Sequence, residues 1–220
     1  QPGDVILVDG ASRFSTAVKY LTQSTWSHAA LYVGPRLGRH DANGEPLLVV
    51  EADVSEGVRA VPLTQFAGLH LRVCRPVSLT GDEAQAVTSH ALARLGHRYD
   101  LRNVFDLMRW LLPTPPVPLR WRRRLLALGS GDPTRAICST LVAQAFESVR
   151  YPILPQVEQR PANDPLCPLC VEEILHVRHH SLFVPRDFDV SPYFEIVKPT
   201  LAQGFDPHRL TLITDPLGSD

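Results

Sequence analysis

The alternation of apolar and polar positions divides the chain into short strands and a few amphipathic helices. Apolar runs bounded by Gly, Pro, Asn or Asp predict strands at 4–8, 28–33, 47–52, 58–62 and 69–77, with a last strand segment within 187–198. Apolar residues at helical spacing predict helices at 12–23, capped by Ser12, and at 80–95, where Thr80 and Glu83 form a capping box. This mixture predicts an α+β fold in which an antiparallel sheet or half-barrel packs against helices.

The most informative helical pattern follows Cys138. Apolar residues at 141, 142, 145, 146 and 149 define one face of a helix, so Cys138 would lie at or just before its first turn. Unpaired N–H groups and the positive end of the helix dipole favour a thiolate there, and the thiolate is the nucleophilic form of cysteine. The alternative interpretation is a small, buried and unreactive cysteine.

A cysteine nucleophile needs a base and a group that orients the base. His28 opens the apolar run at 28–33, and Glu51 ends the next one, where a buried strand would not favour a carboxylate. If the two runs pair, Glu51 can reach the far nitrogen of His28, fix its tautomer and stabilise the imidazolium. Asp53 has the same strand parity and is the reserve candidate. The alternatives are a hydrogen-bonded core histidine and a solvated strand end.

Several short blocks, taken in order, carry a family resemblance: Gly3–Val8, Thr25–Gly34, Val50–Ala52 followed by Gly57–Val58, Tyr99–Asp100, and Cys138–Val142. They resemble the circularly permuted branch of the NlpC-type papain-like cysteine hydrolases, which includes the lecithin:retinol acyltransferase-like enzymes. In this branch the histidine and the acidic residue precede the cysteine, as they do here. The resemblance covers roughly residues 2–150.

The resemblance implies a permuted papain-like fold and assigns roles by position. Cys138 matches the nucleophile, His28 the base and Glu51 the polar residue that orients the base. Tyr99 falls where related sequences have a tyrosine near the active site. The candidate substrate-binding residues are Tyr99, Trp26, Trp110 and Trp121.

The chain length and the net charge limit the classes of protein to which this sequence can belong. At 220 residues, the chain is expected to form one catalytic domain over 1–200, with a Pro-rich insertion at about 101–130 and a loosely held tail over 201–220. A formal net charge of −1 argues against a protein that binds nucleic acid through bulk electrostatics. No apolar stretch is long enough to span a bilayer, so a soluble protein is expected, with the cytoplasm as the favoured compartment.

The segment 101–128 combines apolar and aromatic residues with a Pro-rich stretch and an arginine cluster. One interpretation is a Pro-broken helical hairpin that packs over the core. The other is a lid over the active site or an interfacial element that contacts a membrane surface, because Trp and Arg beside Leu suit such a surface.

A second group of chemically active residues lies nearer the C-terminus. Cys167 and Cys170 are followed by His176, His179 and His180, which is a possible zinc set. The spacing to the histidines is poor for a finger, so a turn with exposed thiols, or a disulfide in an oxidising compartment, is favoured.

These patterns together predict a cysteine hydrolase of the amidase or peptidase type that acts through a Cys138 thioester and needs no metal or organic cofactor. Its expected partner is a peptide, amide or acyl-lipid substrate, and the oligomeric state stays open. A lipid-directed acyltransferase or thioesterase of the same fold is one alternative. A non-catalytic zinc-binding or interaction module is the other.

Overall fold

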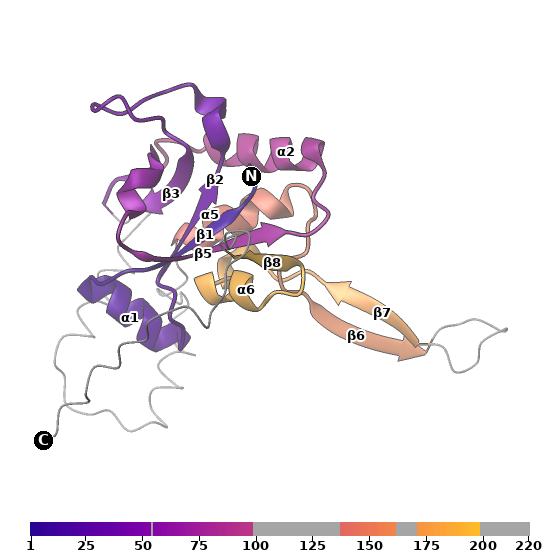
Figure 1. Ribbon diagram of the computed structural model, residues 1–220. Helices are drawn as coiled ribbons and strands as arrows, with labels where there is room; N and C mark the ends of the chain where they lie inside the picture. Colours follow the sequence, from indigo (N-terminus) through magenta and orange to yellow (C-terminus); the bar gives the residue numbers. More distant parts are fainter. Residues whose placement is uncertain (54, 99–136, 162–170, 199–220) are drawn as a thin grey trace, which may run out of the picture.

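A sheet of six antiparallel strands organises the computed structural model, which describes residues 1–53, 55–98, 137–161 and 171–198 (Figure 1). The strands run in the spatial order β4-β3-β2-β1-β5-β8. Their bounds are β1 Val5–Asp9, β2 His28–Tyr32, β3 Val49–Asp53, β4 Gly57–Val61, β5 His70–Pro76 and β8 Phe194–Val197. The expected antiparallel sheet is confirmed, and the five strands predicted before residue 80 lie where the apolar runs placed them.

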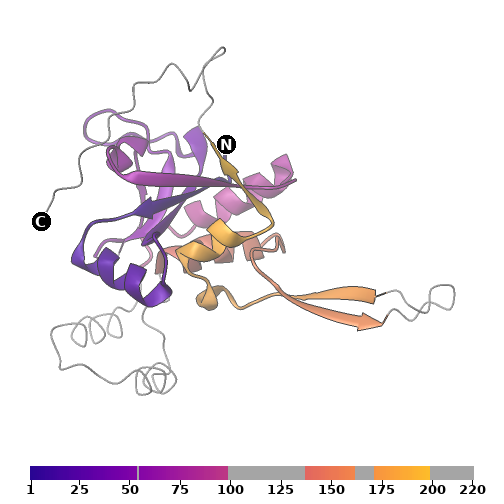
Figure 2. The ribbon, with the colours of Figure 1, turned by 60° about the horizontal axis from the view of Figure 1, so that its bottom comes forward.

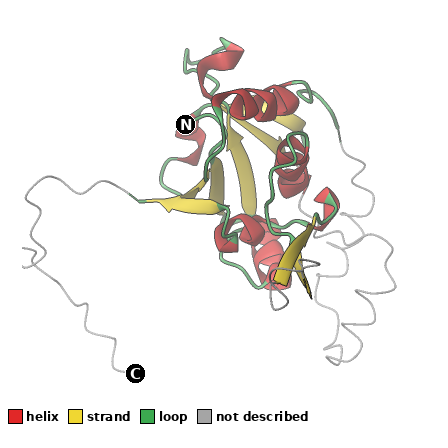
Figure 3. Ribbon diagram, turned by 90° about the vertical axis from the view of Figure 1, so that its right-hand side faces the viewer, coloured by secondary structure: helices red, strands yellow, loops and turns green. Residues whose placement is uncertain are grey.

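Four helices of the described part pack around this sheet (Figure 3): α1 Arg13–Thr22, α2 Gly81–Leu92, α5 Ile137–Glu147 and α6 Pro185–Val190. Short 3₁₀ turns lie at Gly34–Leu37, Leu63–Phe66 and His180–Leu182. Both predicted caps are present, since Ser12 accepts a bond from the backbone of Ser15 and Thr80 forms the capping box with Glu83. Among the described residues, no helix has both the length and the apolar character needed to cross a bilayer.

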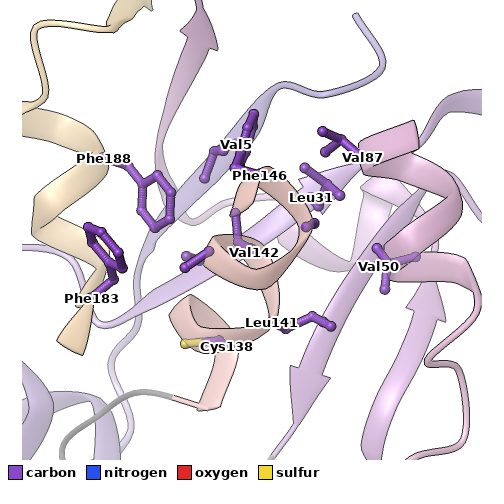
Figure 4. Packing of buried hydrophobic residues seen from close by; sticks show 14 of the residues in the cluster. Val5, Leu31, Val50, Val87, Cys138, Leu141, Val142, Phe146, Phe183 and Phe188 are labelled. Carbon is purple, nitrogen blue, oxygen red and sulfur yellow. The ribbon is translucent and has the colours of Figure 1, made fainter. Parts of the chain in front are cut away.

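The main core fills the space between α5, α2 and one face of the sheet (Figure 4). Leu141, Val142 and Phe146 of α5 are fully buried, as the helical spacing predicted. They meet alternate residues of the strands, such as Val5 and Leu31. Burial of each such side chain stabilises the fold by roughly 1.5–3 kcal/mol. The helix that carries Cys138 is therefore fixed rigidly against the sheet.

A smaller apolar cluster covers the opposite face of the sheet. It contains Ile6 and Val8 of β1, Ala30 of β2, Val49 of β3 and Phe66 of the second 3₁₀ turn. Residues of even number on β1 and β2 and of odd number on β3 therefore share this face, because side chains alternate along a strand.

Two parts of the C-terminal region differ from the expectation. The segment predicted as a strand within 187–198 is helical over Pro185–Val190, and β8 begins only at Phe194. The residues β6 Gln156–Pro161 and β7 Val171–His176 form an unpredicted hairpin that projects from the body (Figure 2). The sequence of this hairpin is mostly polar and Pro-flanked, so it lacks the apolar periodicity by which strands are recognised.

The predicted insertion at 101–130 and tail at 201–220 lie outside the described residues.

Candidate active site

Cys138 lies in the first turn of α5, with its sulfur directed away from the helix axis (Figure 4). Only 5% of the residue is exposed. The first N–H groups of a helix have no acceptor within the helix, so the start of α5 presents partial positive charge beside the thiol. The predicted position of this cysteine is confirmed.

His28 is the first residue of β2 and bridges Glu51 and Cys138. Its Nε2 lies 2.7 Å from Oε2 of Glu51. A hydrogen bond also joins the His28 side chain to Cys138, and since Nε2 is engaged by Glu51, Nδ1 is the ring nitrogen left for the sulfur. The backbone N–H of Ala29, next along β2, donates to the same sulfur. The structure therefore brings together the three residues that the sequence singled out.

Strand pairing explains why His28 meets Glu51. Leu31 pairs with Val50 and Tyr32 with Val49, which brings β2 and β3 side by side in antiparallel order. His28 and Glu51 then extend from the same face of the sheet, as the alternation of side chains requires.

Glu51 is almost completely buried, and three side chains satisfy its carboxylate. His28 occupies Oε2, while Oε1 accepts bonds from Arg59 (Nε at 3.0 Å and Nη2 at 2.8 Å) and from Gln65 (Nε2 at 2.9 Å). A buried carboxylate without partners would be strongly unfavourable, so Arg59 and Gln65 make an ionised Glu51 possible at this position.

The three ionisable groups shift one another's pKa values. Burial raises the pKa of Glu51, but the hydrogen bond and charge of His28, and then those of Arg59, outweigh burial and lower it. Burial lowers the pKa of His28, but the charge and hydrogen bond of Cys138, followed by those of Glu51, raise it to about 10. Burial raises the pKa of Cys138, but the charge and hydrogen bond of His28, aided by the Ala29 N–H, bring it below the ordinary value of 9.0. The favoured state is a thiolate–imidazolium pair oriented by a carboxylate.

Asp53, the reserve candidate, has a different position. Its Oδ1 accepts bonds from the backbone N–H groups of Ser55 and Glu56 and from the Ser55 hydroxyl. Its other oxygen lies 3.7 Å from Arg59. The carboxylate next to the His28 ring is thus that of Glu51.

Trp26 is 3% exposed, and its Nε1 donates to Asp189 at 2.9 Å. Arg72 lies over its ring at 5.0 Å from the centroid. These contacts tie the loop that precedes His28 to α6 and β5, and a role of Trp26 in substrate binding stays a prediction. The other predicted substrate-binding residues, Tyr99, Trp110 and Trp121, lie outside the described part of the chain.

Sequence reasoning missed Arg59 and Gln65. A signal for Arg59 was present, because Glu51 and Arg59 are directly opposite each other in the antiparallel pair of β3 and β4. Opposite charges at such a position stabilise a pair of strands. Gln65 comes from the 3₁₀ turn after β4, and no pattern in the sequence pointed to it.

The proposed zinc set is only partly described, because Cys167 and Cys170 fall outside the described residues. Nε2 of His176 is 2.7 Å from Glu158 of the neighbouring strand. Nδ1 of His180 is 2.9 Å from Glu147 of α5. Within the described ranges, no group of three or more His, Cys, Asp or Glu side chains could hold a metal ion.

Comparison with known proteins agrees with this geometry. Residues 1–107 match the family of permuted papain-like amidase enzymes named for YaeF and YiiX. The matched part contains His28 and Glu51, and it confirms the resemblance to permuted papain-like hydrolases. It supports a cysteine hydrolase of the amidase type in general. The narrower placement beside the NlpC-type and lecithin:retinol acyltransferase-like enzymes stays a prediction.

The fold has a solved counterpart in the crystal structure of metalloprotein yiiX from Escherichia coli. The TM-score is 0.51 at 19% sequence identity, and the alignment covers 92% of this chain and 98% of that one. At this identity the likeness speaks for the fold, which is a permuted papain-like α+β fold as expected. No functionally curated protein matches the chain.

Proposed function

We propose that this protein is a cysteine hydrolase that cleaves an amide bond through a thioester on Cys138, with His28 as the base and Glu51 as the orienting group. One observation carries the proposal. The His28 ring is held between a buried, fully bonded carboxylate and a cysteine in the first turn of a helix. Cysteine nucleophiles activated by an imidazole and a third orienting group have this arrangement.

Acylation starts from the thiolate–imidazolium pair. The Cys138 sulfur attacks the substrate carbonyl, the carbonyl electrons move to oxygen, and the C–N bond then breaks. His28 donates its Nδ1 proton to the departing amine. A water molecule next loses a proton to His28, attacks the thioester carbonyl and releases the acid and the thiolate.

The negative oxygen of the tetrahedral intermediate needs hydrogen-bond donors. The backbone N–H of Cys138 lies in the first turn of α5, where it has no acceptor within the helix. It is the natural donor for this oxygen. The same feature that favours the thiolate would therefore stabilise the charge that develops during the reaction.

Metal chemistry is not part of this proposal. The yiiX protein of Escherichia coli, which shares the fold, is described as a metalloprotein. In the described ranges of this chain the necessary ligands do not gather, because Glu51 is already committed to His28, Arg59 and Gln65. The residues in these ranges therefore do not fit a metal.

Site-selective alkylation tests the proposal. Iodoacetamide labelling across a pH series, read by peptide mass, should show Cys138 as the most reactive thiol of the folded protein below pH 9.0, since its pKa is lowered. Labelling should abolish the hydrolysis of model amides and esters. Faster labelling of Cys167 or Cys170 at low pH would contradict the assignment of the nucleophile. Hydrolysis that survives complete labelling of Cys138 would contradict the mechanism.

A further inference from the structure

The strand that carries His28 is paired on one side only where it begins. β2 pairs with β1 from His28 to Leu31, but its pairing with β3 begins only at Leu31. At the His28 end, the other side of the strand is turned to α5, where the Ala29 N–H donates to the sulfur of Cys138. The position of the His28 ring therefore also depends on what holds the residues just before it.

Trp26, two residues before His28, is held by a distant part of the chain. Its side chain is buried, with 3% of the residue exposed, so the indole N–H needs an acceptor inside the protein. The acceptor is Oδ2 of Asp189, at a distance of 2.9 Å and 163 positions further along the chain. This bond joins the loop before His28 to α6.

Arg72 of β5 completes this contact. Its Nη1 donates to Oδ1 of Asp189 at 2.5 Å, and its guanidinium lies 5.0 Å from the centre of the Trp26 ring. The ring of His70 also lies against Trp26, with 5.2 Å between the ring centres. Both oxygens of the carboxylate are therefore bonded, and the indole is held from α6 and from β5. We call Trp26, Arg72 and Asp189 the indole anchor.

The helix α6 gives the indole anchor a firm support. Phe188, next to Asp189, is fully buried in the core (Figure 4), and its ring packs edge-on against an aromatic ring of β8. On the other side, Asp187 accepts the backbone N–H of Val184 at 3.0 Å, at the start of the helix. Because α6 is fixed through the core, Asp189 holds Trp26 in place and does not simply follow its motion.

We infer that Asp189 is a positioning residue of the candidate active site. By holding the Trp26 indole, it fixes the loop that ends at His28 and keeps the imidazole against the sulfur of Cys138. This inference rests on the proposed function. The alternative is that the indole anchor only stabilises the fold, and the two differ in what happens to Cys138 when the anchor is broken.

The direction in which the pKa of Cys138 moves distinguishes positioning from a simple effect of charge. The negative charge of Asp189 raises the pKa of a nearby thiol, as it does for Cys74, so its removal alone would lower the pKa of Cys138 or leave it unchanged. A less firmly held His28 ring weakens the interaction that lowers the pKa of Cys138, so loss of positioning raises it. The two effects have opposite signs.

Alkylation of Cys138 across a pH series measures this pKa without any substrate. Trp26→Phe keeps an aromatic ring and every charge but removes the N–H, and Asp189→Ala removes the acceptor. In both variants we expect the pH midpoint of alkylation to move upward, and the alkylation rate below that midpoint and kcat to fall about three- to tenfold. Trp26→Phe is the milder change, so the test stands even where Asp189→Ala lowers the melting temperature.

A double variant and a matched control complete the experiment. Trp26→Phe combined with Asp189→Ala should lose no more than the larger of the two single losses, because each change breaks the same bond. Asp187→Ala removes the other carboxylate of α6, which bonds Val184 and not the indole. It should lower stability but leave the pH midpoint of Cys138 unchanged.

The outcomes separate this inference from the proposed function. A raised midpoint in both single variants, in a protein that hydrolyses no model amide or ester, would support the positioning role and overturn only the proposed function. Hydrolysis by the wild-type protein, with an unchanged midpoint and kcat in folded Trp26→Phe and Asp189→Ala, would overturn the positioning role alone. A lowered midpoint in Asp189→Ala, or an equal upward shift in Asp187→Ala, would also overturn it. A higher KM with unchanged kcat in Trp26→Phe would do the same, because Trp26 would then act on the substrate directly.

Discussion

Two cysteines in the same apolar core show how neighbouring groups, and not burial alone, set the pKa of a thiol. Cys74 on β5 and Cys138 on α5 are both free, buried and part of one core cluster. Burial and then the negative charge of Asp189 raise the pKa of Cys74 to about 12. Burial also raises the pKa of Cys138, but His28 and the Ala29 N–H reverse this effect. A buried thiol becomes a nucleophile only where an imidazole and N–H donors compensate its desolvation.

Replacement of each cysteine by alanine should give the largest difference in activity between two variants. Cys138→Ala is expected to lower kcat/KM at least about a thousandfold, because it removes the sulfur that forms the thioester in the proposed mechanism. Cys74→Ala should keep the activity and lower the free energy of unfolding by about 1 kcal/mol, since it leaves a small cavity in the core. Steady-state kinetics and denaturant unfolding of both variants measure the two effects. Loss of activity in a fully folded Cys74→Ala protein would remove the distinction between the two thiols.

A change of the base should make Cys138 resemble Cys74. In His28→Ala the burial of Cys138 stays while its cationic partner is lost, so its pKa should rise above 9.0. We expect alkylation of Cys138 below that pH to become slow and turnover to fall about a hundredfold or more. Peptide mass analysis after timed alkylation gives the rate for both cysteines in one sample. Unchanged labelling of Cys138 near pH 7 would show that the helix start, and not His28, lowers its pKa.

The orienting carboxylate should have a smaller effect than the base. Glu51→Gln keeps the shape of the side chain but loses its charge, and we expect a decrease in turnover of about ten- to a hundredfold, with more residual activity than His28→Ala. Glu51 helps to raise the pKa of His28 to about 10, so its charge favours the protonated ring. The activity of the wild-type protein should fall as pH rises through about 10, and in Glu51→Gln this fall should occur at lower pH. A pH profile with an unchanged alkaline limb would contradict the role assigned to Glu51.

The site formed by Cys138, His28 and Glu51 was predictable from the sequence because each of its parts belongs to a local sequence pattern. The helix after Cys138 has a complete apolar face, and His28 and Glu51 mark the ends of apolar runs that pair in antiparallel order. Both signals depend on residues that are close together in the sequence. The order of the three residues along the chain also contributed to the family resemblance. The caps at Ser12 and Thr80 are equally local, and they too are confirmed.

Other features depend on three-dimensional context that periodicity does not contain. Gln65 reaches Glu51 only through the turn after β4. The β6–β7 hairpin has mostly exposed residues, so its strands bury little apolar surface and leave no alternating pattern. The helix at Pro185–Val190 is six residues long, too short for helical spacing to separate it from the strand that follows.

The smallest expected effect concerns Arg59, the residue opposite Glu51 that the sequence analysis missed. Two of its nitrogens bond Oε1 of Glu51, and a lysine cannot reproduce this forked contact. We expect Arg59→Lys to lower turnover about two- to fivefold and stability by about 1 kcal/mol, because Glu51 keeps its bonds to His28 and Gln65.

The matched control for this variant is Arg39→Lys, which changes an exposed arginine in the loop after the first 3₁₀ turn and should alter neither quantity. Turnover and unfolding are compared for the two variants under the same conditions. If Arg59 acts through Glu51, its variant should move the alkaline limb of the pH profile in the same direction as Glu51→Gln but by less. This follows because a less firmly held carboxylate raises the pKa of His28 less. A loss as large as that of His28→Ala would mean that Arg59 itself contacts the substrate. The difference between Cys138 and Cys74 would then depend on Arg59 as a third partner of Cys138.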